Sequence, residues 1–252
     1  MVAVWVLLLA QPAVEAYQRA NALLNQRDFD GARRTVEEAL RLDPKLTPAL
    51  ILRAKLAINT NQLDDALTPL ETARQIEPNN RTVRFLLGFV FYLKNDFDRA
   101  RAALAAADSN DPRVLLYRAL TAEALNQPDT AAADFERALQ LDKSGAEPRV
   151  AYARFLFAQG QTDRAEPLID QALKLAPQSA DALYEKGRCL LERAEFAAAA
   201  EFGERSLTAP DAAVLERRIR YLLVRAYTKT GNREAAAKHQ AAFERLPNPL
   251  VR

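Results

Sequence analysis

The chain has few of the residues that most enzyme and metal sites require. Its 252 residues include one cysteine, Cys189, and one histidine, His239. A single cysteine excludes an intrachain disulfide framework and a zinc site built from several thiolates, and a single histidine excludes most metal-ligand and acid-base sets. We therefore interpret Cys189 as a core thiol and His239 as a structural residue.

Glycine is scarce as well, with seven residues, whereas alanine, leucine, arginine and glutamate dominate the sequence. These abundant residues favour helix, and few positions require the positive φ angles that glycine supplies. Hydrophobic residues make up 49% of the chain, which is enough for a sizeable core. The composition predicts an all-α fold.

No excess of one charge is present, because 35 Lys and Arg stand against 33 Asp and Glu, giving a net charge of +2. The whole chain therefore has no field that would concentrate nucleic acid at its surface, and we predict no nucleic-acid partner. The sequence also has no phosphate-binding glycine loop, no metal-spaced cluster and no G-x-S-x-G motif. We predict that the protein is not an enzyme and binds no cofactor or metal.

The one long apolar run is VAVWVLLLA, from Val2 to Ala10. Nine residues cannot span a bilayer, but the length suits a secretory signal, and Val14-Glu15-Ala16 supplies a cleavage site. No Lys or Arg precedes the run. We expect residues 1–16 to be a signal peptide or an apolar extension, with a periplasmic or secreted protein. The alternatives are a helical turn packed on the first repeat or a misassigned start codon, which leave a cytoplasmic location open.

A small residue recurs along the chain with spacings of 34, 34, 31, 34, 34 and 37 residues. The members of this series are Ala32, Ala66, Ala100, Ala131, Ala165, Ala199 and Ala236. A second series lies 12 residues ahead of the first: Ala20, Ala54, Gly88, Ala119, Ala153, Gly187 and Val224. The two series predict two helices per repeat that approach closely, because only small side chains permit such contact.

Each repeat has the pattern of a helix, a polar turn, a second helix and a stop, and proline often supplies the stop. Seven units begin near residues 13, 47, 81, 112, 146, 180 and 217, so the repeats span residues 13–252. Two irregularities are expected. Three residues are lost between Ala107 and Ala119, and three are gained around Pro210 to Arg218.

This pattern resembles the tetratricopeptide repeat family, which places small residues at repeat positions 8, 20 and 27 and proline at position 32. The resemblance implies a right-handed superhelical solenoid of about seven helix-turn-helix units. It also implies a scaffold for protein interactions. In this family the first helices of successive repeats line a concave groove, into which positions 2, 5, 9 and 12 point.

The resemblance divides the expected groove into two parts. The middle is apolar and aromatic and is expected to face outward from the core; the alternative is that its phenylalanines pack between adjacent helices. The C-terminal part has a ladder of arginines with aromatic neighbours, which suits carboxylates and acidic peptides. The middle residues are Phe85, Phe89, Tyr92, Leu116 and Leu120, and the C-terminal residues are Arg154, Phe157, Tyr184, Arg188, Tyr221 and Arg225. The remaining groove candidates are Tyr17, Asn21 and Lys55.

Acidic residues near the arginine ladder offer a second interpretation, in which the ladder is neutralised internally. These residues are Glu123, Glu147, Asp181, Glu185 and Glu192. One family use is not expected: the clamp for the C-terminal carboxylate of heat-shock chaperones, because only Asn21 matches its residue pattern.

We therefore expect a scaffold that binds a protein or peptide, with its oligomeric state open. By family analogy, envelope or secretion-related assembly is the expected setting, and a cytoplasmic adaptor is the alternative.

Overall fold

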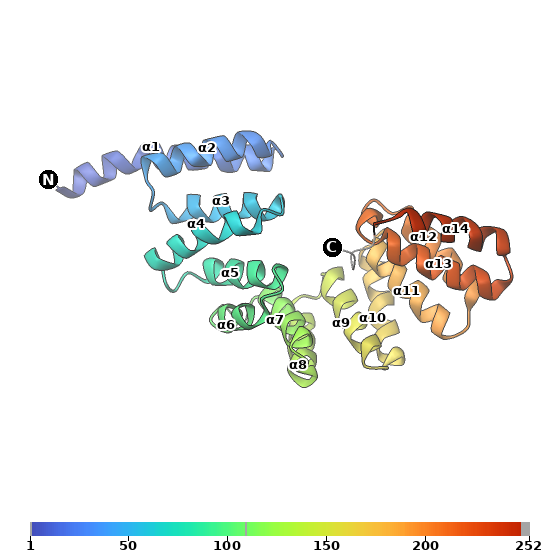
Figure 1. Cartoon of the computed structure of the whole chain (residues 1–252). Coiled ribbons are helices and arrows are strands. Elements are labelled where there is room, and N and C mark those ends of the chain that lie inside the picture. The colour runs from blue at the N-terminus through green and yellow to red at the C-terminus, as the bar shows by residue number, and fades with distance from the viewer. Residues whose placement is uncertain (1, 109, 248–252) are drawn as a thin grey trace. The chain divides into compact units, whose positions relative to one another are not determined.

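The computed structural model describes residues 2–108 and 110–247 (Figure 1). These residues form fourteen α-helices, one 3₁₀ helix and no strand, which confirms the all-α repeat fold. The first helices of the repeats are α1 (Val2–Asn25), α3 (Thr47–Asn59), α5 (Arg81–Leu93), α7 (Pro112–Ala124), α9 (Ala146–Ala158), α11 (Ala180–Glu192) and α13 (Glu216–Thr230). The second helices are α2 (Phe29–Leu42), α4 (Leu63–Ile76), α6 (Phe97–Ala105), α8 (Pro128–Leu141), α10 (Thr162–Leu175), α12 (Phe196–Leu207) and α14 (Arg233–Arg245).

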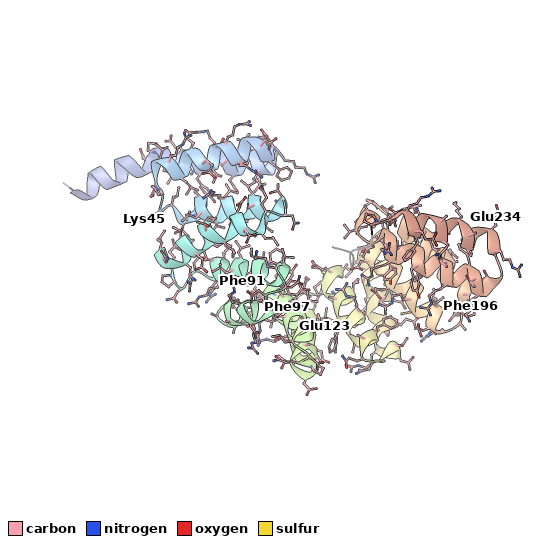
Figure 2. All side chains as sticks on the ribbon, viewed as in Figure 1. Lys45, Phe91, Phe97, Glu123, Phe196 and Glu234 are labelled. Carbon is pink, nitrogen blue, oxygen red and sulfur yellow. The ribbon has the colours of Figure 1, made fainter. Side chains whose placement is uncertain are left out.

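Contacts divide the chain into two compact units, unit 1 (Met1–Asp134) and unit 2 (Phe135–Arg252). In unit 1, α1 packs on α2, α3 on α4 and α5 on α6; in unit 2, α9 packs on α10, α11 on α12 and α13 on α14. Each unit has its own hydrophobic core. Phe91, labelled in Figure 2, belongs to a core of unit 1, and Phe196, also labelled there, is partly buried against a core of unit 2.

The small residues of the two series lie where paired helices touch. Ala20 and Ala32 are fully buried between α1 and α2. Gly88 shows why size matters, because a Cβ atom added there would lie 2.5 Å from Cγ of Leu104 on the paired helix. A close approach of this kind leaves no room for a larger side chain.

One residue in the turn between the two helices of each repeat has a positive φ. The seven are Arg27, Asn61, Asn95, Asn126, Gly160, Ala194 and Gly231, with φ between 55° and 78°. Glycine and asparagine adopt this left-handed conformation most readily. Arg27 and Ala194 adopt it without that advantage, so the repeat fold dictates these turns.

The two irregularities in spacing have distinct structural causes. The loss is the net of a shorter helix and a longer connection: α6 has nine residues where α4 has 14, and six residues separate α6 from α7 where four separate α4 from α5. The gained residues form a 3₁₀ helix, η1 (Ala212–Val214), before α13. Gly203 of α12 is small because Leu222 and Leu223 of α13 fill its space, with Leu223 Cδ2 2.7 Å from an added Cβ.

The first helix includes most of the N-terminal segment singled out in the sequence. α1 continues through Pro12, and Ala13 and Ala16 are fully buried. Met1 and the side chains of Val2 to Ala10 lie outside the described residues, so the expected signal peptide stays a prediction. Among the residues that the structure describes, no helix has the length and apolarity needed to cross a membrane.

Candidate functional site

Five charged side chains from α9, α11 and α13 gather in unit 2, and we call them the arginine cluster. They are Arg154, Asp181, Glu185, Arg188 and Arg218. Glu185 lies at the centre and is fully buried. Nη1 of Arg188 donates a 2.6 Å hydrogen bond to Oε2 of Glu185, and Nη2 of Arg218 lies 3.5 Å from Oε1.

Pairing within the arginine cluster is incomplete. Nη1 of Arg154 lies 3.7 Å from Oδ2 of Asp181, which is an ion pair without a hydrogen bond. Oε1 of Glu185 and Oδ1 of Asp181 are buried and accept no hydrogen bond. Burial raises the pKa of Glu185, although Arg188 and Arg218 oppose that increase. The cluster therefore holds a carboxylate whose charge is only partly compensated.

Two aromatic rings contact two of the three guanidinium groups of the cluster, those of Arg188 and Arg218. The guanidinium of Arg188 lies 5.0 Å from the ring centroid of Phe157 and 5.9 Å from that of Tyr184. The guanidinium of Arg218 lies 4.7 Å from the ring centroid of Tyr184. These distances suit cation-π contacts, which orient the arginines without using their hydrogen-bond donors.

The arginines lie partly at the surface, above the buried carboxylate. The side chains of Arg154, Arg188 and Arg218 are 34%, 33% and 43% exposed. Each guanidinium has five N–H donors, and the three together donate one hydrogen bond within the described residues, that of Arg188. Most donors of the cluster are thus available to an acceptor from outside.

The aromatic face of unit 1 consists of Phe85, Phe89 and Tyr92 on α5 and Tyr117 on α7. The rings of Phe85 and Phe89 are stacked with centroids 6.1 Å apart, and Phe89 lies 4.6 Å from Tyr117. Tyr92 contacts Tyr117 at 5.5 Å. All four side chains are half-buried, so their rings pack together and still reach the surface.

A hollow of about 210 Å³ adjoins the aromatic face. Phe85, Lys55 and Arg113 are among the residues that line it. The Arg113 guanidinium lies 5.4 Å from the centroid of Phe85 and also bonds to Asp111. The aromatic face thus has cations only at its edge, whereas in the arginine cluster three arginines surround a central carboxylate.

Two expectations for the aromatic middle were wrong. Leu116 and Leu120 are 3% and 9% exposed, so they belong to the core and do not face outward. Tyr117 follows Leu116 by one residue, which is about 100° around the helix, and it is the residue that meets Phe89. Phe85 and Phe89 do pack against the next repeat's helix, as the alternative interpretation stated.

The arginine ladder is only partly assembled as expected. Arg154 and Arg188 lie in the cluster, but Arg225 makes no hydrogen bond or ion pair with the residues that the structure describes. Tyr184 is 8% exposed and lies beneath the arginines. Tyr221 is 54% exposed and contacts Phe243 of α14 at 6.0 Å.

The first repeat contributes less to a site. Tyr17 is half-buried against the core of the first repeat, whereas Asn21 is exposed. They lie in unit 1 and contact neither Lys55 nor the aromatic face through any hydrogen bond or ring contact in the described ranges.

Sequence reasoning missed Tyr117, Arg113 and Arg218. Arg113 and Arg218 occupy repeat position 2, which the family pattern places in the groove. The repeat pattern could therefore have identified both residues. The predicted groove residues came mainly from positions 5 and 9. Tyr117 occupies position 6, which most other repeats bury.

Cys189 and His239 lie in structural surroundings. Burial raises the pKa of the Cys189 thiol to about 12, so little thiolate is available for chemistry. His239 is 2% exposed, with Nε2 2.9 Å from Glu204 and Nδ1 3.2 Å from Arg220. Across residues 2–108 and 110–247, no group of three or more His, Cys, Asp or Glu side chains could hold a metal ion.

Solved structures share this fold. The structure of pilF from Pseudomonas aeruginosa is 20% identical, with a TM-score of 0.68 over 79% of this chain and 92% of that one. The APC/C hetero-tetramer Cut9-Hcn1 contains a chain that is 21% identical, with a TM-score of 0.77 over 85% of this chain and 43% of that one. These likenesses concern the fold alone.

One curated relative is the DnaJ homolog subfamily C member 7 homolog of Schizosaccharomyces pombe, which is 25% identical over 195 residues. The match covers 70% of this chain and 41% of the relative, so the chain spans about two fifths of that protein's length. Two family models, each described as "Tetratricopeptide repeat", match residues 17–80 and 150–214, and residues 66–124 and 122–174. The chain therefore belongs to the tetratricopeptide repeat family, whose members are scaffolds for protein interactions.

Proposed function

We propose that this protein is a non-catalytic scaffold that holds an extended acidic segment of a partner protein. The segment lies against the first helices of unit 2. The observation that carries the proposal is the arginine cluster, in which three partly exposed guanidinium groups have donors to spare. Family membership supports the same class of function, since these repeats present helix faces to protein partners.

The chemistry of the arginine cluster favours carboxylates over other groups. A guanidinium donates two parallel N–H bonds to a carboxylate, and the contacts with Phe157 and Tyr184 hold Arg188 in a fixed orientation. Successive repeats place Arg154, Arg188 and Arg218 on three helices, α9, α11 and α13. This spacing suits several acidic side chains of one extended segment.

The aromatic face of unit 1 is proposed as a second contact for apolar residues of a partner. Half-exposed rings such as Phe85 and Phe89 provide contact area at little entropic cost. The Cut9-Hcn1 hetero-tetramer shares the fold and is itself an assembly of proteins. We extend only that general role to this chain, without an enzymatic activity of its own.

The proposed setting is the bacterial envelope or a secretion-related assembly, because of the apolar run from Val2 to Ala10. Fractionation of producing cells, with an antibody against the protein, tests this location. A processed product in the periplasm or medium supports export. A full-length product confined to the cytosol contradicts it and favours a cytoplasmic adaptor.

Site-specific photocrosslinking tests the proposed function. A photoreactive phenylalanine analogue replaces Phe157, next to the arginine cluster, and in a matched control it replaces Leu175, which is 45% exposed on the second helix α10. We expect one dominant partner adduct from position 157, identified by mass spectrometry, and little from position 175. Equal adducts from both positions, or none from either, would contradict the proposal.

A further inference from the structure

We propose that Glu185 is a built-in competitor for the partner's carboxylate, displaced from Arg188 and Arg218 when the partner binds and then protonated by solvent. This inference rests on the proposed function and names how the same site is regulated. It concerns acidic segments, because their carboxylates compete with Glu185 for the guanidinium donors of Arg188 and Arg218.

Comparison of the repeats shows that Glu185 is unusual for its position. Counted from the repeat starts, it is the sixth residue of its repeat. The equivalent residue is buried and apolar in four other repeats: Leu52, Leu86, Ala151 and Leu222. A fully buried carboxylate at a core position has a desolvation cost that the fold alone does not require.

The contacts of Glu185 leave its partners exchangeable. Only Oε2 accepts a hydrogen bond, from Arg188, while Oε1 lies 3.5 Å from Arg218 and accepts none. Both arginines are partly exposed, so an incoming carboxylate reaches them from solvent without moving a helix. A ligand carboxylate that takes over the donors nearest Glu185, in addition to the unused donors of the cluster, thus replaces one hydrogen bond and one loose ion pair.

The charges around Glu185 determine the consequence of that exchange. Arg188 and Arg218 face it most closely, with Asp181 and Arg154 beyond them. Three cations and two carboxylates leave the cluster at +1. Once a ligand carboxylate engages the arginines, Glu185 stays buried with less compensation, and uptake of a proton removes the unpaired charge.

Isothermal titration calorimetry of the full chain with octaglutamate tests this inference, with octaglutamine as the uncharged control. Titrations in MOPS and in imidazole, two buffers without phosphate or carboxylate that differ in ionisation enthalpy, count the protons taken up. If binding takes up one whole proton, the affinity for octaglutamate falls by about tenfold for each unit that the pH rises between pH 6 and pH 8. We expect Glu185→Gln to bind more tightly than the wild type, with an affinity that is nearly independent of pH.

Asp181→Asn is the matched control, because it removes the other carboxylate of the cluster and leaves Glu185 in place. It should keep the pH dependence of the wild type. Circular dichroism checks that both variants fold; if Glu185→Gln does not, the proton count of the wild type decides alone.

Three results would overturn the inference: wild-type affinity that does not vary with pH, a Glu185→Gln variant with an unchanged pH dependence, or no binding of octaglutamate. Partner adducts at position 157 without octaglutamate binding would overturn this inference and leave the proposed function standing.

Discussion

Unit 1 and unit 2 repeat the same contact between an arginine and an aromatic ring. In unit 1, Arg113 at position 2 of its repeat lies over Phe85 at position 5 of the preceding repeat. In unit 2, Arg218 lies over Tyr184 in the same relation. The backbone therefore presents these two positions to each other in both units.

The residue after the ring makes the two faces different. Leu86 comes directly after Phe85 and belongs to the hydrophobic core of unit 1, whereas Glu185 comes directly after Tyr184 and pairs with two arginines. Arg113 instead pairs with Asp111, the N-cap of its own helix. In these two repeats, the residue at this buried position thus accompanies the difference between an apolar and an ionic face.

Exchange of the two residues at that position should have the largest effect. Leu86→Glu buries a carboxylate that has no arranged partners, and we expect it to lower the free energy of unfolding by about 3 kcal/mol or more. Glu185→Leu should change it by less than about 1 kcal/mol or raise it, since it removes the desolvation cost of the carboxylate and the two arginines it leaves are partly exposed and can be hydrated. Urea denaturation followed by circular dichroism measures both. Equal losses would show that position 6 is not what separates the units.

Substitutions in the arginine cluster should weaken octaglutamate binding far more than substitutions in the aromatic face. Arg188→Gln with Arg218→Gln should weaken octaglutamate binding by about 100-fold, because two charge-assisted interactions of about 1.5 kcal/mol each are lost. Phe85→Ala with Phe89→Ala, the matched pair in unit 1, should change it by less than about threefold. Fluorescence anisotropy of labelled octaglutamate gives both affinities. Similar losses in the two double variants would mean that binding is not confined to the cluster.

A fall in pH from 7.5 to 5.5 should lower the stability of unit 2 and leave that of unit 1 unchanged, because the chain's one histidine lies in unit 2. Burial lowers the pKa of His239, whose Nδ1 accepts from Arg220. The neutral form therefore favours folding, and its stability is present above pH about 6.5 and lost as the pH falls below that value.

Hydrogen exchange of α13 and α14 between pH 7.5 and 5.5, corrected for intrinsic rates, measures this loss. A Glu185→Gln background removes an opposing effect, since the raised pKa of Glu185 favours folding as the pH falls. The added substitution His239→Gln should abolish the loss. Loosening that persists without His239 would assign it to another group.

The left-handed turn positions should give the smallest effects. Ala194→Gly in unit 2 should raise the free energy of unfolding by about 0.5 to 1 kcal/mol, because alanine is strained at its φ of 61°. Asn126→Gly, at the equivalent turn in unit 1, should gain less, since asparagine tolerates this conformation. Thermal unfolding compares the two. A loss at position 194 would argue that the turn is not strained.

Small residues predicted the fold well because they report on backbone distance. Gly88 and its counterparts lie where paired helices touch, so their period reveals the helix pairs directly. The strained turns at Arg27 and Ala194 were not predictable, because neither residue prefers a positive φ. The repeat imposes that conformation on them.

The site was harder to predict because its contacts cross between repeats. Arg154 and Arg188 share one repeat position and were found, but Arg218 acts from position 2 on the preceding repeat. The three-residue gain that forms η1 precedes α13, and Arg225 at the aligned position has no partner among the residues described. Neither the burial of Glu185 nor that of Leu116 can be inferred from a helical period alone.

Hydrogen exchange of the full chain with and without octaglutamate tests the central claim most directly. We predict slower exchange in the first helices of unit 2, at Ala146–Ala158, Ala180–Glu192 and Glu216–Thr230, with α10, α12 and unit 1 unchanged. Protection confined to the second helices or to unit 1, or no protection at a saturating concentration, would contradict the account.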